Sequence, residues 1–236
     1  ERMLEGFGYP VNRHADHTVL QPGGALRAAD LTIPGDFSSA AFFLVAATVV
    51  PGSRIELHGV GMNPTRTGLL EILKSMGAKI EINNPRTTAG EPIADLIVES
   101  SNLRGVDVPP ALVSRTIDEF PALSIAAAHA NGLTRISGAQ ELRFKESDRI
   151  ATVVAGLRSV GIKVSEQPDG MVIAGGVIQE GTVDSRKDHR VAMAFAVAGA
   201  TGVVRILNCA NVVTSFPDFA KCSQRVGVKL REEKTG

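Results

Sequence analysis

The residues best suited to chemistry include a charged segment, RFKESDR, at positions 143–149. Lys145 and Arg149 stand four residues apart, so they share a face if a helix has already begun there. Glu146 lies between them, which places a proton-transfer group beside cations able to bind carboxylates or phosphates. A solvated helix start, capped by the serine or the aspartate of the segment, explains the same charges without any function.

A second charged segment, KDHR, places His189 and Arg190 in the first turn of an apolar helical pattern. A cation at that position opposes the helix dipole, so a surface arginine would gain nothing there. An arginine directed at a bound anion would gain binding energy. Asp118 opens another apolar run, IDEFPALSIAAA, and is a further candidate proton acceptor.

The elements that must position these residues form a repeat. Three segments each carry an aspartate, a run of small and apolar residues, a glycine and a short β-branched strand; the aspartates are Asp36, Asp118 and Asp188. Their spacing is too long for a solenoid and is typical of a unit with two helices and three or four strands. Each aspartate is expected at or near the N-cap of its helix, which is the non-functional interpretation of all three.

The first helix of each unit is apolar nearly all round, so it must be buried; the expected ranges are 40–50, 120–130 and 191–200. The similarity of the units predicts three buried helices side by side and parallel. Their amino ends would then meet on one face, where the positive ends of the helix dipoles create an anion site.

A second, amphipathic helix follows in each unit and ends at a glycine suited to a left-handed C-cap, namely Gly77, Gly161 and Gly227. A strand is expected after each glycine, at 79–82, 163–165 and 229–230. The Pro-, Gly- and Thr-rich stretch at 83–94 reads as a loop.

Composition excludes several classes of protein. The 236 residues hold 25 Lys and Arg against 25 Asp and Glu, which argues against nucleic-acid binding. Two cysteines are too few for a disulfide framework, no apolar run is long enough to span a bilayer, and no signal peptide is recognisable. We therefore expect a cytoplasmic protein that binds no membrane. The start at Glu1 suggests a piece of a longer protein, and HADH at 14–17 reads as a polar hairpin tip rather than a metal site.

Six motifs together resemble a known family. They are GDFSSAAFFL, NPTRTGLLEILKSMGA, IDEFPALSIAAA, LRFKESDRI, KDHRVAMAFAVAG and SFPDF. In this order and spacing they are similar to the C-terminal domain of the 5-enolpyruvylshikimate-3-phosphate synthases, the 3-phosphoshikimate 1-carboxyvinyltransferases of the shikimate pathway of aromatic amino acid biosynthesis.

The resemblance implies an α/β fold, an inside-out barrel-like domain of three repeated βαβαββ units with three parallel buried helices. The units are expected at about 25–100, 101–175 and 176–236, after a tail of a missing N-terminal domain at 1–24. It also implies transfer of the enolpyruvyl group from phosphoenolpyruvate to the 5-hydroxyl of 3-phosphoshikimate, in a cleft shared by two domains. No metal or cofactor takes part, glyphosate occupies the phosphoenolpyruvate site, and the protein is expected to be a monomer.

The resemblance also suggests roles for individual residues. Asp118 matches a carboxylate that contacts shikimate hydroxyls and takes the hydroxyl proton, and Lys145 matches a lysine between the two substrates. Glu146 matches the proton-transfer glutamate. Arg149 and Arg190 match two arginines on phosphoenolpyruvate, with His189 beside them.

Two positions depart from some family members, which carry an asparagine where Glu141 stands and a lysine where Thr214 and Ser215 stand. A chain without its first domain is expected to be folded but nearly inactive. Two alternatives stay open: the related transferase acting on UDP-N-acetylglucosamine, and a catalytically silent scaffold domain.

Overall fold

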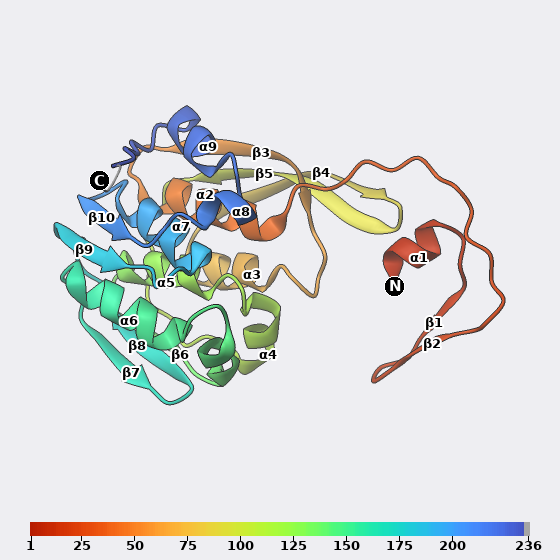
Figure 1. Cartoon of the computed structure of the whole chain (residues 1–236), viewed down its shortest axis with the longest axis horizontal. Coiled ribbons are helices and arrows are strands. Elements are labelled where there is room, and N and C mark those ends of the chain that lie inside the picture. The colour runs from red at the N-terminus through yellow and green to blue at the C-terminus, as the bar shows by residue number, and fades with distance from the viewer. Residues whose placement is uncertain (234–236) are drawn as a thin grey trace.

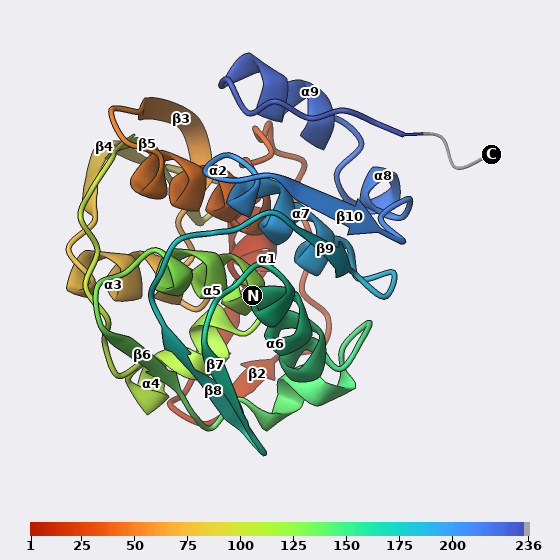
Figure 2. The same ribbon diagram turned by 90° about the vertical axis from the view of Figure 1, so that its left-hand side faces the viewer.

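The computed structural model describes residues 1–233. Three buried helices pack against one another at its centre, and Figure 2 shows strands and the remaining helices around them. They are α2 (Phe37–Val49), α5 (Phe120–Ala128) and α7 (His189–Ala198). Their small side chains let the helix backbones approach closely, and nearly every residue of the three is buried. The predicted set of buried helices is therefore confirmed, with ends that differ by a few residues.

The first unit surrounds α2 with an antiparallel sheet in the order β3-β5-β4. A single parallel bridge from Gly35 to Val60 precedes it. The elements are β3 (Arg54–Gly61), α3 (Gly68–Ser75), β4 (Lys79–Thr88) and β5 (Glu91–Glu99). The loop expected at 83–94 is wrong, because this stretch continues β4 and β5 as a hairpin. Ala89 and Gly90 both have positive φ and form the turn of this hairpin. The Pro, Gly and Thr content had suggested that the whole stretch was an irregular loop.

The second unit repeats this order around α5, with the sheet β6-β8-β7. Its elements are α4 (Pro110–Val113), the 3₁₀ helix η1 (Ser114–Thr116), β6 (Leu133–Ile136), η2 (Gln140–Phe144), α6 (Arg149–Ser159), β7 (Val164–Gln167) and β8 (Gly170–Ala174). The amphipathic helices α3 and α6 end where expected. Gly77 and Gly161 follow them with φ of 100° and 82°, in the left-handed region that glycine adopts at low cost.

The third unit departs from the repeat. It holds β9 (Gly181–Asp184), β10 (Val204–Leu207), α8 (Val212–Ser215) and α9 (Phe219–Arg225), and β9 and β10 pair in parallel. The strand predicted at 229–230 is wrong: the described residues after α9 form no strand. The two preceding units build their last two strands as a hairpin, and no such hairpin follows β10 up to residue 233. The final residues of the expected unit, 234–236, lie outside the described part of the chain.

The N-terminal segment stands apart from this body (Figure 1). It comprises α1 (Arg2–Gly6) and the hairpin of β1 (Val11–Arg13) with β2 (Thr18–Leu20), so the polar hairpin tip predicted at 14–17 is confirmed. Helix α1 contacts β5, and Arg2 lies 3.9 Å from the Glu91 carboxylate. Within residues 1–233, no helix combines the length and the apolar character that a membrane span requires.

Candidate functional site

The amino ends of the three buried helices meet at one place. Ser38, in the first turn of α2, donates from its Oγ to Oε1 of Glu119, the N-cap residue of α5, at 2.5 Å. Arg190, in the first turn of α7, donates from Nη1 to the backbone oxygen of Asp118 at 3.2 Å. Contacts of this length require the three helices to begin on the same side. The predicted meeting of the three helix amino ends on one face is thus confirmed, and the positive ends of their dipoles point to it.

Asp118 lies at the centre of this cluster. Its Oδ1 lies 3.5 Å from Arg149 Nη1 and 3.6 Å from Lys145 Nζ. Its Oδ2 lies 3.4 Å from Arg66 Nη2 and 3.8 Å from Arg190 Nη2. Asp118 lies next to the N-cap residue Glu119, so its predicted position at or near the N-cap is confirmed, but its side chain makes no capping bond to α5. The side chain is instead free to face four cations drawn from all three units.

The charge state of Asp118 follows from these contacts. Its partial burial favours the neutral acid, but the nearby guanidinium and ammonium groups favour the carboxylate more strongly, with Arg190 first among them. The net result is a pKa of Asp118 below its ordinary value. An ionised carboxylate in this position can accept hydrogen bonds from hydroxyl groups and hold the cations in place.

Arg149 is completely enclosed, with 1% of its side chain exposed. Its Nε donates to Oδ2 of Asp188 at 2.8 Å, and its Nη2 pairs with the Glu146 carboxylate. Its Nη1 is buried and makes no hydrogen bond to any described residue. Asp188 is fully buried and caps α7 by accepting from the backbone N–H groups of Arg190 and Val191. The predicted cap role of Asp188 is confirmed, and the same carboxylate anchors Arg149.

Lys145 and Glu146 precede α6 rather than lying on it. The helix begins at Arg149, and its N-cap Asp148 accepts from the backbone N–H of Ala151, as the non-functional interpretation of RFKESDR predicts. Lys145 and Arg149 therefore do not share a helix face. The extended backbone at Lys145 nevertheless directs its Nζ to the same carboxylate that Arg149 reaches.

Two exposed carboxylates complete the charge pairs of the cluster. Glu141 Oε1 lies 2.7 Å from Lys145 Nζ, and its side chain is 65% exposed. Glu146, which pairs with Arg149, is 45% exposed. Among the described residues each of them pairs with a single cation, so an incoming anion could displace them at lower cost than a buried partner.

His189 is the first residue of α7 and lies among these charges. Burial lowers its pKa, Glu146 opposes that shift, and Arg190 adds to it; the net pKa is lower than usual. The ring is therefore neutral at pH 7, so it can donate or accept a hydrogen bond but adds no charge to the helix end.

Three residues of the cluster were not found from the sequence: Ser38, Arg66 and Glu119. Arg66 lies two residues before α3, so it is a cation beside a helix amino end and carried the same sequence signal as Arg190. Glu119 is adjacent to Asp118 but has an apolar neighbour on its other side, so its side-chain direction could not be read from the sequence. Ser38 carried no signal.

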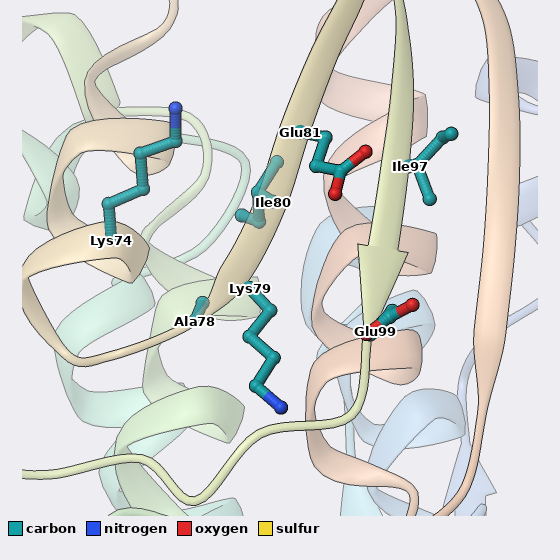
Figure 3. A pocket seen from close by; sticks show the side chains of 7 residues that line it. All are labelled: Lys74, Ala78, Lys79, Ile80, Glu81, Ile97 and Glu99. Carbon is teal, nitrogen blue, oxygen red and sulfur yellow. The ribbon is translucent and has the colours of Figure 1, made fainter.

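Two hollows of the surface lie elsewhere. One, of about 470 Å³, is bordered by Lys74, Lys79, Glu81 and Glu99 together with apolar side chains of β4 and β5 (Figure 3). Its acidic and basic groups balance, and it includes no member of the Asp118 cluster. In residues 1–233, no three His, Cys, Asp or Glu side chains gather in a way that could hold a metal ion.

Comparison with known proteins gives consistent matches. The family model described as EPSP synthase (3-phosphoshikimate 1-carboxyvinyltransferase) matches residues 1–222. A 3-phosphoshikimate 1-carboxyvinyltransferase of Acidithiobacillus ferrooxidans is 55% identical over 232 residues, which are 98% of this chain and 54% of that protein. One from Methylococcus capsulatus is 52% identical and is covered to 53% of its length. The chain spans about half the length of these curated relatives.

Solved structures agree with the fold. An EPSP synthase from Acinetobacter baumannii superposes with a TM-score of 0.94 at 43% identity, over 97% of this chain and 54% of that one. The enolpyruvyl transferase NikO from Streptomyces tendae gives a TM-score of 0.73 at 16% identity, over 99% of this chain and 53% of that one, a likeness of fold alone. The predicted α/β enolpyruvyl transferase fold is confirmed.

Proposed function

The chain belongs to the EPSP synthase (3-phosphoshikimate 1-carboxyvinyltransferase) family, and from this premise we propose that it supplies one half of an enolpyruvyl transferase site. The reaction would transfer the enolpyruvyl group of phosphoenolpyruvate to the 5-hydroxyl of 3-phosphoshikimate and release phosphate. The site carries no cofactor in this proposal, since acid–base chemistry and fixed cations suffice.

One observation carries the proposal. Lys145, Arg149 and Arg190, which come from two different units, converge within 3.5–3.8 Å of a single carboxylate, that of Asp118. Scattered surface charges would not gather in this way. Both substrates are phosphorylated and carry a carboxylate, so several fixed cations at helix amino ends suit them.

Each residue has a role in this proposal. Arg149 and Arg190 bind phosphoenolpyruvate with His189 beside them, and Lys145 stands between the two substrates. Asp118 orients the shikimate hydroxyls and receives the proton of the attacking one. The lowered pKa of Asp118 makes it a weak base in the free chain. Substrate anions that pair with its four cations would raise that pKa toward the value a general base needs.

Glu146 delivers a proton to the methylene carbon of phosphoenolpyruvate, with Lys145 nearby. The 5-hydroxyl oxygen forms a bond to the adjacent carbon and gives its proton to Asp118. The tetrahedral intermediate then loses phosphate, which takes up the proton held by Asp118. The methyl group returns one proton to Glu146, which restores the double bond. Asp118 and Glu146 both stand next to fixed cations, which lower the cost of the charge changes at each step.

The charge balance of the free site supports displacement on binding. Its four cations face five carboxyl groups, namely Asp118, Glu119, Glu141, Glu146 and Asp188. The cations are thus internally paired until a substrate arrives. Release of Glu146 from Arg149 by the phosphoenolpyruvate anion would free that carboxyl for proton transfer, which couples binding to chemistry.

The other half of the site is proposed to come from an N-terminal domain. The chain covers only about half the length of the curated relatives that it matches. We assign 25–236 to the C-terminal domain and 1–24 to the tail of the N-terminal domain. A monomeric, cytoplasmic enzyme without nucleic-acid or membrane partners completes the proposal.

The test is complementation. This chain is assayed for phosphate release from phosphoenolpyruvate and 3-phosphoshikimate, alone and after mixing with a separately produced complementary half. We expect almost no turnover alone, turnover after mixing, and a loss of about 10²–10⁴-fold with Glu146→Gln, the range for a general acid–base group.

A matched control distinguishes chemistry from charge loss. Glu166→Gln removes a carboxylate that pairs with Arg143 outside the cluster, and it should leave the rate unchanged. Full turnover by the chain alone would refute the shared cleft, and an active Glu146→Gln mixture would refute the assigned proton donor. Assays with UDP-N-acetylglucosamine in place of 3-phosphoshikimate test whether the chain belongs to the related transferase. A mixture of the two halves without turnover would favour the alternative of a catalytically silent scaffold domain.

A further inference from the structure

We propose that Arg66 is a further anion-binding residue of this site, held in place by Ser38 and by the buried carboxyl group of Glu119. The ligand would be a phosphate or carboxylate group of a substrate. This inference rests on the proposed function, because it adds a fourth cation to the site assigned to Lys145, Arg149 and Arg190.

The loop that carries Arg66 is built to a fixed shape. Asn63 Oδ1 accepts from the backbone N–H of Thr65 at 3.0 Å. The backbone N–H of Arg66 donates to the backbone oxygen of Asn63 at 2.9 Å, which closes a turn. Arg115, from the second unit, donates from Nε to the Pro64 oxygen at 2.6 Å. Two units therefore fix the backbone from which the Arg66 side chain extends.

The guanidinium of Arg66 is directed at the cluster yet remains half exposed, with 47% of its side chain accessible. Its Nη2 donates to Ser38 Oγ at 2.9 Å, and the Asp118 and Glu119 carboxylates lie farther away, at 3.4 and 3.6 Å. An arginine has five N–H donors, and among the described residues this group makes that one hydrogen bond. The remaining donors are available to a ligand.

Glu119 has the properties of a positioning residue. Its side chain is 1% exposed, and its Oε1 lies 3.6 Å from Arg66 Nη2 and also 3.6 Å from Arg190 Nη1. Its Oε2 is buried without a hydrogen-bond partner among the described residues. A carboxyl group in such a place is costly to bury, and burial raises the pKa of Glu119 although the Ser38 hydrogen bond and the two flanking arginines offset part of that cost. Glu119 thereby sets the spacing between them.

The result is a two-sided arrangement around Asp118. Arg66 and Arg190 flank Oδ2, whereas Lys145 and Arg149 flank Oδ1. An anion that settles on the Oδ2 side would meet two guanidinium groups set apart by Glu119, and each can donate two parallel hydrogen bonds to a phosphate or carboxylate.

The experiment titrates the wild-type chain and three variants with phosphoenolpyruvate, following backbone and arginine side-chain signals by NMR. Arg66→Met should raise the Kd about fivefold to thirtyfold, the range for one half-exposed hydrogen bond to a charged group. Arg135→Met is the matched control: it removes a half-exposed arginine of β6 that pairs with Asp107, away from the cluster, and its Kd should equal that of the wild type.

The third variant, Arg190→Met, separates this inference from the proposed function. If Arg190→Met weakens binding and Arg66→Met does not, the proposed site stands and the inference about Arg66 is overturned. If neither weakens binding, or the wild-type chain binds no phosphoenolpyruvate, both are overturned. Thermal unfolding of each variant shows whether the fold is retained.

A mutant cycle tests the role of Glu119. Glu119→Gln keeps the size of the side chain and its acceptor for Ser38 but removes the charge that orders both arginines. In the wild-type background it should raise the Kd severalfold, and in the Arg66→Met background its effect should be clearly smaller. Equal effects of Glu119→Gln on the Kd in both backgrounds would show that Glu119 does not act through Arg66. If Glu119 has only a structural role, Glu119→Gln would lower stability and leave the Kd of the folded chain unaltered, which would also contradict the proposal.

Discussion

Replacement of Arg149 should destabilise the fold more than replacement of any exposed charged residue in the chain. This is expected although the sequence motifs mark Arg149 as a substrate-binding residue. The guanidinium is enclosed and bonded to Asp188, which is itself fully buried. In Arg149→Met the apolar stem remains, but the Asp188 carboxylate loses its buried countercharge. Only neutral donors remain to it: Ser147 Oγ at 3.1 Å and the two N–H groups it caps.

The magnitude follows from that loss. Leaving one partner of a buried ion pair uncompensated costs about 3–5 kcal/mol. For a chain of this size each kcal/mol lowers the melting temperature by about 2–4 °C, so a fall of roughly 6–20 °C is expected. Urea unfolding followed by circular dichroism gives the free energy directly. The double variant Arg149→Met with Asp188→Asn removes both charges and retains an N-cap side chain, so it should recover about 2 kcal/mol or more.

An exposed pair provides the comparison. Arg135→Met breaks the half-exposed pair with Asp107 and should cost less than about 1 kcal/mol. The reasoning is refuted if Arg149→Met unfolds within about 1 kcal/mol of the wild type. It is also refuted if Asp188→Asn gives no recovery in the Arg149→Met background.

Two further predictions concern the interior. His129 is hydrogen-bonded to the Ile125 oxygen and to Thr201 Oγ1, and burial lowers its pKa below 6.5 even though the backbone bond opposes the shift. The unfolded chain therefore binds more protons than the folded chain. The free energy of unfolding should fall as the pH drops from about 7.5 through 6.5, until the pH passes the folded-state pKa. His129→Gln should shallow this slope in urea midpoints measured at pH 7.5 and 5.5, and an unchanged slope would contradict the assignment. A Cβ added at Gly156 would lie 2.4 Å from the Phe195 ring, so Gly156→Ala should cost about 1–3 kcal/mol by overpacking α6 against α7, whereas Gly176→Ala, whose Cβ would meet only Ile162 at 3.4 Å, should unfold at nearly the wild-type urea concentration.

Much of the fold could be predicted from the sequence because it depends on local pattern. The all-round apolar runs identified α2, α5 and α7, and the glycines at positions 77, 161 and 227 ended the amphipathic helices with positive φ as expected. The third unit was harder. Residues 229–230 alternate as a strand would, but a strand exists only where a neighbour supplies hydrogen bonds, and the sequence of one segment does not specify its neighbour.

The candidate site was predictable in membership more than in arrangement. Arg190 and its neighbour His189 were selected because a cation at a helix amino end opposes the dipole unless an anion binds there. Lys145, Glu146 and Arg149 were selected because a carboxyl group beside cations can transfer a proton to a bound anion. All five lie at the meeting point of the buried helices. Their functional roles remain proposals. What the pattern could not give is the difference between an enclosed Arg149 and an accessible Arg66, since exposure depends on what the other units place over each side chain.

The sequence by itself determined which segments are buried, where the helices end, and that cations stand where helix dipoles disfavour them. These are properties of periodicity and of local backbone preference, and they are fixed within a few residues along the chain. Only the tertiary structure decided that Asp118 faces four cations instead of capping α5, and that Glu119 lies between Arg66 and Arg190. Those contacts join positions 38, 66, 118, 145 and 190, and such distant residues become neighbours only when the three units pack their buried helices together.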